Sequence, residues 1–292
     1  MSETWTVQRV LVWTAQHFEK KGVDAPRLTA DLLLAYALGT QRVRLYMDMD
    51  RPLQKDELAS FRALIERRVA GEPTAYLIGR QDFYGRTFAV DARVLVPRPE
   101  TELLVEAVLQ EVPKDAPARL AELCTGSGCI AATLGVERPN AQVFATDLSP
   151  DACAVARKNV EALGVQARVH VLEGDLLSPL PKDAPFQVVV SNPPYIASGE
   201  IAGLSAEVRR EPRMALDGGA DGLDLVRRIA REAKGYLAPG GLLALEIGET
   251  QGAQVKALLE AEGYGGVRVE KDLERRDRHA YGRLPAAEGT QG

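Results

Sequence analysis

The sequence feature that most restricts the fold is an alternation of short β-rich runs with helical patterns, which begins near residue 118. Strands are predicted at residues 118–123, 142–146, 168–172, 186–190 and 242–247. Segments with helical spacing lie among and after them, at residues 130–136, 150–163, 223–236 and 251–262. Strands that alternate with helices form parallel sheets with crossover helices. The pattern therefore predicts an α/β domain with an open, doubly wound sheet, whose ligands bind beyond the carboxyl ends of the strands.

The chain before this alternation has a different pattern. Apolar residues recur at helical spacing over residues 1–80, and glycines such as Gly22 and Gly39 stand where helices would end. Residues 81–97 change to aromatic and β-branched residues around Gly85, which is typical of a hairpin. We therefore predict a helical domain over residues 1–80 and a β-hairpin linker over residues 81–97.

The α/β domain is predicted to extend over residues 98–284. Two prolines approach its first helix, which is expected to begin at Glu100 or Thr101. Residues 285–292 are terminal and nearly without apolar bulk, so a disordered tail is predicted there.

Charge and cysteine usage exclude several classes of protein. The chain has 36 Lys and Arg against 41 Asp and Glu, a net charge of −5, whereas proteins that coat phosphate backbones are usually basic. A direct nucleic-acid substrate is therefore not expected. Its three cysteines form no C-x-x-C pair and its three histidines no H-E-x-x-H pair, so neither a disulfide framework nor a metal site is predicted. No signal peptide or membrane span is recognisable, which predicts a cytoplasmic protein.

A glycine motif, A-E-L-C-T-G-S-G, ends the first predicted strand and enters a helix. Gly126 and Gly128 allow backbone to pass close to a ligand, and the helix beyond them presents unpaired N–H groups. About 20 residues later Asp147 ends the second strand, where a carboxylate can accept hydrogen bonds from the vicinal hydroxyls of a ribose. The same spacing also fits a dinucleotide-binding fingerprint, so the glycines alone leave the cofactor open. A tight turn without a ligand, and a helix cap for Asp147, are the plain alternatives; Ser149 is the better cap.

The third strand ends in V-L-E-G-D-L-L, which places Asp175 and Leu176 at the same edge of the sheet. Asp175 is a candidate acceptor for an adenine amino group, and Leu176 a candidate cover for the adenine ring. A turn carboxylate without a ligand remains an alternative. The glycine-rich acidic run 211–224 lacks the spacing of a calcium loop, so we expect a turn that closes over the site.

The fourth strand ends in the sharpest motif, Asn192-Pro193-Pro194-Tyr195. Two prolines remove two N–H donors and keep the chain extended, which leaves backbone carbonyls as acceptors. The amide oxygen of Asn192 adds a further acceptor, and Tyr195 adds an aromatic face. Such an array suits a planar NH₂ group, whose two hydrogens are accepted while its plane is stacked.

Together these motifs resemble S-adenosylmethionine-dependent methyltransferases that act on planar amino groups. The segments V-L-V-P-R-P-E-T-E, E-P-R-M-A-L-D-G-G-A-D-G-L-D and D-L-E-R-R-D-R-H-A-Y-G-R, with the helical N-terminal region, extend the resemblance to the HemK/PrmC family over nearly the whole chain. This implies the class I S-adenosylmethionine-dependent methyltransferase fold, with a Rossmann-like doubly wound sheet and an N-terminal helical bundle. It also implies methyl transfer to the side-chain amide nitrogen (N5) of the glutamine in the Gly-Gly-Gln motif of class 1 peptide chain release factors.

The resemblance assigns roles to individual residues. S-adenosylmethionine is expected to be bound by Glu122, Cys124, Thr125, Gly126, Ser127, Gly128, Asp147, Leu148, Asp175, Leu176 and Asn192. The substrate amide is expected to be bound by Asn192, Pro193, Pro194 and Tyr195, with Asn192, Pro193 and Tyr195 as the catalytic residues. One departure concerns Leu176, because relatives often have an aromatic residue after the third-strand acid. We expect the helical domain to recognise the release factor, and the protein to be a monomer.

The chemistry needs no dedicated base. An amide nitrogen is a poor nucleophile because its lone pair is delocalised. Acceptance of its two hydrogens by Asn192 Oδ1 and the Pro193 carbonyl orients it and favours the positive charge that develops during transfer. An adenine-N6 methyltransferase acting on DNA or RNA would need the same acceptors and is the main alternative. A nicotinamide-dependent oxidoreductase leaves N-P-P-Y unexplained, and a non-catalytic binding module leaves three intact motifs unexplained.

Overall fold

The computed structural model describes residues 4–286, and the contacts within the chain divide it into two compact units. A helical unit comprises the described residues up to Arg80 together with Ser205–Arg210. An α/β unit comprises Gln81–Leu204 and the chain from Glu211 onward. Within the described residues, no helix is long and apolar enough to cross a membrane.

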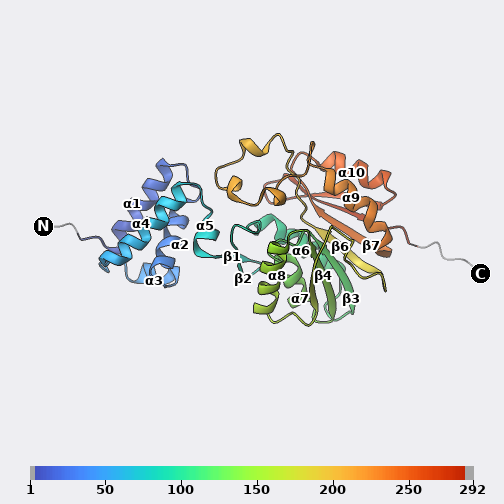
Figure 1. Ribbon diagram of the computed structural model, residues 1–292, viewed down its shortest axis with the longest axis horizontal. Coiled ribbons are helices and arrows are strands. Elements are labelled where there is room, and N and C mark those ends of the chain that lie inside the picture. Colours follow the sequence, from blue (N-terminus) through green and yellow to red (C-terminus); the bar gives the residue numbers. More distant parts are fainter. Residues whose placement is uncertain (1–3, 287–292) are drawn as a thin grey trace, which may run out of the picture. The chain divides into compact units, whose positions relative to one another are not determined.

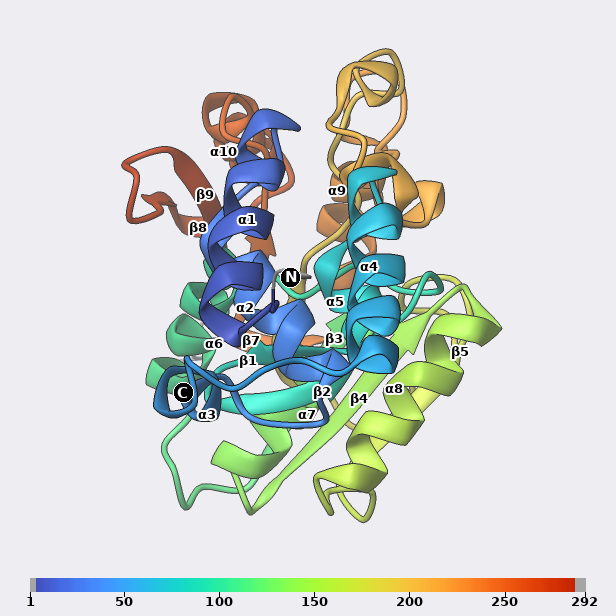
Figure 2. The ribbon, with the colours of Figure 1, turned by 90° about the vertical axis from the view of Figure 1, so that its left-hand side faces the viewer.

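The helical unit is built from five helices: α1 (Val7–Lys20), α2 (Pro26–Ala37), α3 (Arg42–Met47), α4 (Lys55–Val69) and α5 (Thr74–Ile78). Figure 2 shows α2 between the two longer helices α1 and α4. Their apolar faces meet in a core that includes Leu11, Phe18, Leu33 and Phe61, all buried. Helix α1 is capped by Thr6, whose side chain accepts a hydrogen bond from the N–H of Arg9.

Ser205–Arg210 belongs to this helical unit by its contacts, although it falls within the sequence range 98–284. Arg68 pairs with Glu207, and the guanidinium of Arg210 donates to the Ala70 carbonyl at 3.1 Å. Gly71, with φ +92°, also makes room for this segment, because a Cβ there would lie 3.0 Å from the Cβ of Ala206. The end of α4 therefore holds a segment that is more than 130 residues away in sequence.

The α/β unit contains a seven-stranded sheet in the order β5-β4-β3-β6-β7-β9-β8. Its strands are β3 (Ala118–Leu123), β4 (Ala141–Asp147), β5 (Val169–Glu173), β6 (Phe186–Ser191), β7 (Leu237–Glu246), β8 (Gly265–Lys271) and β9 (Asp277–Arg283). The first five are parallel, and β9 is antiparallel to both of its neighbours. From β3 the chain adds β4 and β5 on one side and then crosses to β6 on the other. The predicted doubly wound sheet is confirmed, with its switch point between β3 and β6.

Helices cover both faces of this sheet (Figure 1). Helices α6 (Pro99–Glu111), α7 (Cys129–Glu137) and α8 (Pro150–Ala162) pack on one face, against side chains that include Leu120, Val188 and Val190. Helices α9 (Asp224–Glu232) and α10 (Gly252–Ala261) pack on the other, against Ala121 and Val189. Alternate residues of one strand face opposite layers, as the pleat of a strand requires.

Shorter elements complete the chain. The hairpin of β1 (Arg80–Phe83) and β2 (Arg86–Ala89) turns at Tyr84 and Gly85. Short 3₁₀ helices are η1 (Ile201–Gly203), η2 (Val208–Arg210), η3 (Arg213–Ala215) and η4 (Ala233–Gly235). Residues 285 and 286 lie outside helices and strands, and residues 287–292 of the predicted tail lie outside the described residues.

The hairpin predicted over 81–97 is shorter in the structure, because its second strand ends at Ala89, and α9 ends at Glu232 rather than at 236. Three further differences concern β7, the last two strands and α6. Strand β7 begins at Leu237 rather than at 242. The sequence P-G-G at 239–241 is typical of a turn, but in the structure these residues continue the strand, with an irregular register opposite β6. Strands β8 and β9 were not predicted, since charged residues interrupt both. Helix α6 begins at Pro99, one residue before Glu100, with the proline in its favoured first-turn position.

Candidate active site

The turn from β3 into α7 is built from residues with positive φ: Cys124 (+58°), Gly126 (+53°) and Gly128 (+78°). Gly128 also allows a close approach, since a Cβ there would lie 3.1 Å from the Cα and the Cβ of Ala156 in α8. A Cβ on Gly126 would meet nothing within 4 Å. Gly128 therefore seats α7 against α8, whereas Gly126 borders open space at the end of the sheet.

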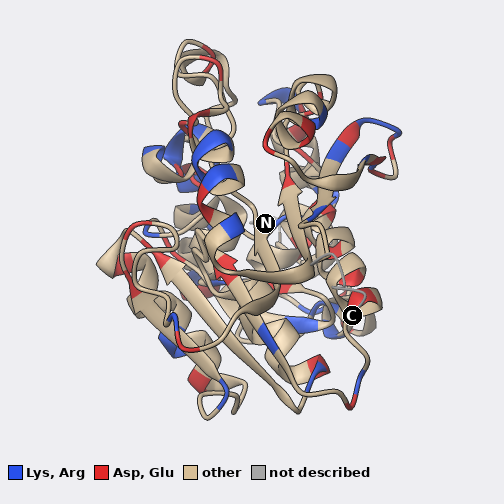
Figure 3. Ribbon diagram, turned by 90° about the vertical axis from the view of Figure 1, so that its right-hand side faces the viewer, with Lys and Arg blue, Asp and Glu red and all other residues tan. Residues whose placement is uncertain are grey.

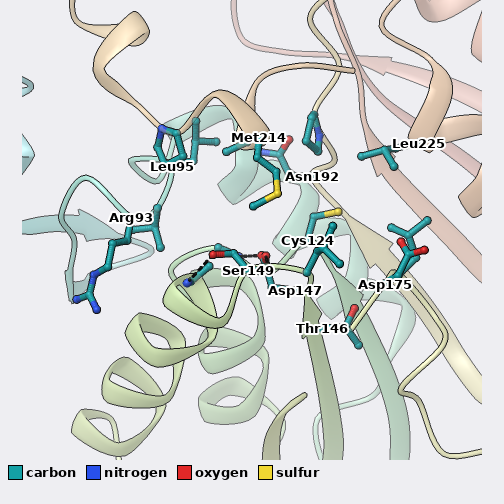
Figure 4. Close-up of a pocket in the computed structure, with 18 residues that line it drawn as sticks. Arg93, Leu95, Cys124, Thr146, Asp147, Ser149, Asp175, Asn192, Met214 and Leu225 are labelled. Atoms are coloured by element: carbon teal, nitrogen blue, oxygen red, sulfur yellow. Dashed lines mark hydrogen bonds between the residues drawn. The ribbon is translucent and has the colours of Figure 1, made fainter. Parts of the chain in front are cut away.

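Asp147 ends β4 directly beside this turn (Figure 4). Its Oδ2 accepts from the N–H of Gly126 at 2.9 Å, and its Oδ1 from the N–H of Ser149 at 2.9 Å. Ser149 caps α8, as predicted, by accepting from the N–H of Ala152 at 3.2 Å. Burial raises the pKa of Asp147, and the backbone N–H groups oppose that shift. A carboxylate oxygen has two lone pairs, so each oxygen keeps capacity for another donor.

A cavity lies at the carboxyl ends of β3, β4, β5 and β6, where ligands bind in sheets of this type. Seven of the predicted cofactor-binding residues line it: Cys124, Gly126, Asp147, Leu148, Asp175, Leu176 and Asn192. Pro194 lines it as well. Figure 4 shows Asn192 and Met214 on one side of this space and Asp147 on the other.

Asp175 has a partner within the protein. Its carboxylate accepts from the guanidinium of Arg228 in α9, at 2.8 and 3.1 Å, and this pair is about half exposed. Leu176 is buried with φ +48° and contributes an apolar wall. Asp175 therefore lines the cavity, as an adenine acceptor would have to, while its carboxylate is also held by an ion pair to α9.

A second, smaller cavity shares Leu95, Cys124, Gly126 and Asn192 with the first. Glu122, Thr125 and Ser127 line only this second space, and Gly128 lines neither. The carboxylate of Glu122 accepts from the Thr125 hydroxyl at 2.6 Å and from the Ala131 N–H at 2.9 Å. Burial raises the pKa of Glu122 to about 8, against these two hydrogen bonds.

Of the N-P-P-Y motif, only Asn192 and Pro194 line the cavities. Pro193 is buried, and Tyr195 is half-buried with its carbonyl accepting from Gln251 Nε2 at 2.9 Å. Burial raises the pKa of Tyr195 to about 12. The amide nitrogen of Asn192 donates to the Thr101 hydroxyl at 3.2 Å, and Thr101 donates to Glu246 at 2.6 Å. The sequence predicted Thr101 only as a possible helix start and assigned neither Thr101 nor Glu246 to the site.

The glycine-rich segment after Glu211 follows the N-P-P-Y backbone. The N–H of Gly218 donates to the Ile196 carbonyl at 2.8 Å, and a Cβ on Gly218 would lie 2.7 Å from the Pro194 carbonyl oxygen. A Cβ on Gly222 would overlap the Tyr195 carbonyl oxygen. These glycines let the segment lie against the motif, and Pro212, Met214 and Ala215 then form part of the cavity wall.

Several lining residues were not predicted individually as site residues, although the run 211–224 was expected to close over the site. Leu95 belongs to V-L-V-P-R-P-E-T-E and Met214 to E-P-R-M-A-L-D, so the signal available was membership of a motif without an assigned chemistry. Leu225 follows the second of these motifs and faces the cavity from α9. Over residues 4–286, no three His, Cys, Asp or Glu side chains are grouped as metal ligands would be.

Comparison with known proteins identifies the family. Residues 9–79 match the model of the PrmC N-terminal domain, and residues 99–209 that of the methyltransferase small domain. The release factor glutamine methyltransferase of Geobacter sulfurreducens is 43% identical over 97% of this chain and 98% of its own length. That of Cereibacter sphaeroides is 46% identical over 91% of this chain and 94% of its own length. The chain belongs to the release factor glutamine methyltransferase family. The predicted resemblance to the HemK/PrmC family is thereby confirmed.

Solved structures support the fold of this release factor glutamine methyltransferase family member. A methyltransferase from Pyrococcus furiosus matches with TM-score 0.52 and 20% identity, over 77% of this chain and 98% of its own. The T. thermophilus 16S rRNA N2 G1207 methyltransferase RsmC, solved with AdoMet and guanosine, matches with TM-score 0.53 and 19% identity, over 70% of this chain and 49% of its own. The predicted class I methyltransferase fold with an N-terminal helical region is confirmed.

Proposed function

We propose that this protein transfers a methyl group from S-adenosylmethionine to the side-chain amide nitrogen (N5) of the glutamine in the Gly-Gly-Gln motif of class 1 peptide chain release factors. The observation that carries the proposal is the position of Asn192. It stands on the wall of the cavity that Gly126 and Asp147 also line, so an amide acceptor and the elements of a nucleoside site share one space.

The donor set of the cavity fits S-adenosylmethionine. Asp147 is half-buried and each of its oxygens takes one backbone N–H, which leaves acceptor capacity for the two hydroxyls of a ribose. Leu176 and Leu225 offer apolar surface for a purine ring, and Asp175 offers an acceptor for its amino group. Cys124 to Ser127 of the turn line the two cavities and would hold the remainder of the cofactor, with Glu122 in the adjoining cavity. When bound, S-adenosylmethionine supplies a methyl group that its sulfonium already activates.

The residues of this chain orient the substrate amide. Asn192 Oδ1 and the Pro193 carbonyl accept its two N–H hydrogens, hold the nitrogen in place and favour the positive charge that develops on it. Tyr195 and Pro194 complete the substrate side of the motif. The proton is released after the methyl group arrives, so no base is required to remove it beforehand. We further propose that the helical unit binds the body of the release factor, since the residues that line these two cavities all belong to the α/β unit.

The charges of the site favour a protein substrate over nucleic acid. Among the described residues that line the larger cavity, Asp147 and Asp175 are acidic and Arg93 is basic. The guanidinium of Arg93 pairs with Asp91 and points away from the cavity in Figure 4. Figure 3 shows Lys and Arg interspersed with Asp and Glu over the α/β unit. A path for a phosphate backbone is instead lined mainly by Lys and Arg.

The test is transfer of radiolabelled methyl from S-adenosylmethionine, offered in parallel to an unmethylated class 1 release factor and to an adenine-containing oligonucleotide. We expect label on the release factor, and loss of that label when the glutamine of Gly-Gly-Gln is changed. Label on the oligonucleotide alone would show that the amide-binding motif serves adenine, and would overturn the proposal.

A variant tests the role of Asn192 within the same assay. Asn192→Ala is expected to lower turnover by roughly 100-fold or more, by analogy with loss of a preorganised catalytic hydrogen bond, while cofactor affinity changes little. Asn140→Ala is the matched control, because Asn140 is exposed on the turn before β4. Near-normal turnover by Asn192→Ala would remove Asn192 from the mechanism.

A further inference from the structure

The side-chain amide of Asn192 can face the cavity in two orientations with opposite chemistry. With Oδ1 toward the cavity it accepts a hydrogen bond, and with Nδ2 toward the cavity it donates one. A substrate amide nitrogen carries N–H donors, so only the first orientation is productive for the proposed function, on which this inference rests. The structure contains a chain of hydrogen bonds that selects this orientation.

The topology brings together the three residues that form this series of hydrogen bonds, Asn192, Thr101 and Glu246. Ser191 of β6 pairs with Leu245 of β7, so the next residues, Asn192 just after β6 and Glu246 at the end of β7, lie side by side. Val190 and Ala244, two residues earlier, face the layer of α6, and side chains alternate along a strand. Asn192 and Glu246 therefore face α6, where Thr101 is buried in the first turn.

The direction of each hydrogen bond follows from the donors available. An ionised Glu246 carboxylate only accepts, so the Thr101 hydroxyl must give it the single proton it has. That bond is 2.6 Å long, and both groups are buried. Thr101 then presents only lone pairs to Asn192, whose Nδ2 donates to it at 3.2 Å. We infer that Thr101 and Glu246 are positioning residues, which hold the Asn192 amide with its oxygen toward the substrate.

A proton on Glu246 would abolish this selection. A protonated carboxyl can donate to Thr101, which frees the Thr101 hydroxyl to donate to Asn192 Oδ1 and turns Nδ2 toward the cavity. Burial raises the pKa of Glu246 to about 7; Glu100 raises it further, whereas the Thr101 hydrogen bond, Arg278 and Arg98 lower it. Tyr195, His279, Tyr281 and Cys129 are the other titratable groups near this carboxyl. Turnover should therefore rise with pH through a transition near 7.

Two variants and a conservative control test the inference. Thr101→Val removes the hydroxyl and keeps the shape, so kcat should fall by about 10-fold or more while KM for the release factor and the Kd of S-adenosylmethionine change less than about 3-fold. Thr101→Ser keeps the hydroxyl and should retain most of the turnover. Glu246→Gln presents an amide that can donate to Thr101, so it should lower kcat and remove the pH transition near 7.

The outcomes separate the inference from the proposed function. Failure of the wild-type protein to methylate a release factor would refute the proposed function itself. An active wild-type protein whose Thr101→Val and Glu246→Gln variants keep its kcat and its pH profile would overturn the inference alone. Parallel losses of kcat and cofactor affinity in both variants would show a merely structural role and would also overturn it. If Thr101→Val does not fold, the kcat of Glu246→Gln is compared with that of Thr101→Ser across pH 6 to 8.5. Loss of the transition near pH 7 in Glu246→Gln alone supports the inference, and its persistence there overturns it.

Discussion

Gly128→Ala provides the clearest test of how the turn between β3 and α7 is built. The φ of +78° disfavours any residue with a Cβ by about 1–2 kcal/mol. The new methyl group would also lie 3.1 Å from the Cα and the Cβ of Ala156, and overpacking of this kind costs about 1–3 kcal/mol. Lower entropy of the unfolded chain returns about 0.4–1 kcal/mol. We expect the free energy of unfolding to fall by about 1–5 kcal/mol.

Gly126→Ala is the matched control, because it has a similar φ but no atom within 4 Å of the added Cβ. Gly126→Ala should therefore show the backbone strain without the overpacking. The free energies of unfolding of the two variants should differ by about 1–3 kcal/mol. Urea unfolding followed by far-UV circular dichroism measures the difference. Tryptophan fluorescence serves as a separate signal, since Trp5 and Trp13 both lie in the helical unit. Equal midpoints for Gly126→Ala and Gly128→Ala would refute the argument that Gly128 is required for packing against α8.

Three further predictions concern the carboxylates of the site. Asp147→Ala should weaken S-adenosylmethionine binding by about 10-fold or more in calorimetry, because charge-assisted hydrogen bonds contribute about 1.5–3 kcal/mol each, whereas exposed Asp151→Ala should not. Asp175→Ala should weaken cofactor binding, because Asp175 is the proposed acceptor for the adenine amino group. Arg228→Ala removes only the exposed partner of Asp175 and should change the unfolding free energy by less than about 1 kcal/mol. Equal cofactor affinities in the two variants would make Asp175 a turn residue. Burial raises the pKa of Glu122 from 4.5 to about 8, so the stability that this group contributes is complete below pH 4.5 and is lost as pH rises through 8. Glu122→Gln should make the free energy of unfolding, measured in urea, decline less steeply with pH. An unchanged pH slope would contradict this prediction.

The sheet could be predicted from the sequence where its strands are buried on both faces. Residues 186–190, F-Q-V-V-V, are a nearly continuous apolar run, and residues 118–123 keep four apolar residues among six; apolar runs of this kind are typical of central parallel strands. Strand β8 is different, because most of its residues are exposed and charges interrupt its pattern. Its pairing with β9 depends on tertiary contacts rather than on local periodicity, which is why neither strand was predicted.

Residues at strand ends could be predicted as site residues because strand order alone places them at one edge. Asp147, Asp175 and Asn192 reach the same cavity for this reason. Thr101 and Glu246 could not be predicted in this way. Thr101 reaches Asn192 through the packing of α6 on the sheet, and the two residues are 91 positions apart in the sequence. A buried threonine in a helix has no local pattern that distinguishes a hydrogen-bond relay from ordinary packing.

The backbone around N-P-P-Y explains why the acceptors proposed for the substrate are concentrated at its first two residues. The sequence suggested that the prolines leave a row of carbonyls facing outward. In the structure the Tyr195 carbonyl accepts from Gln251, and the Ile196 carbonyl accepts from Gly218. These bonds anchor the end of the motif to Gln251, which precedes α10, and to the glycine-rich segment. Acceptor capacity for a substrate amide is therefore expected at Asn192 and Pro193, and Tyr195 is fixed by its backbone before any substrate binds.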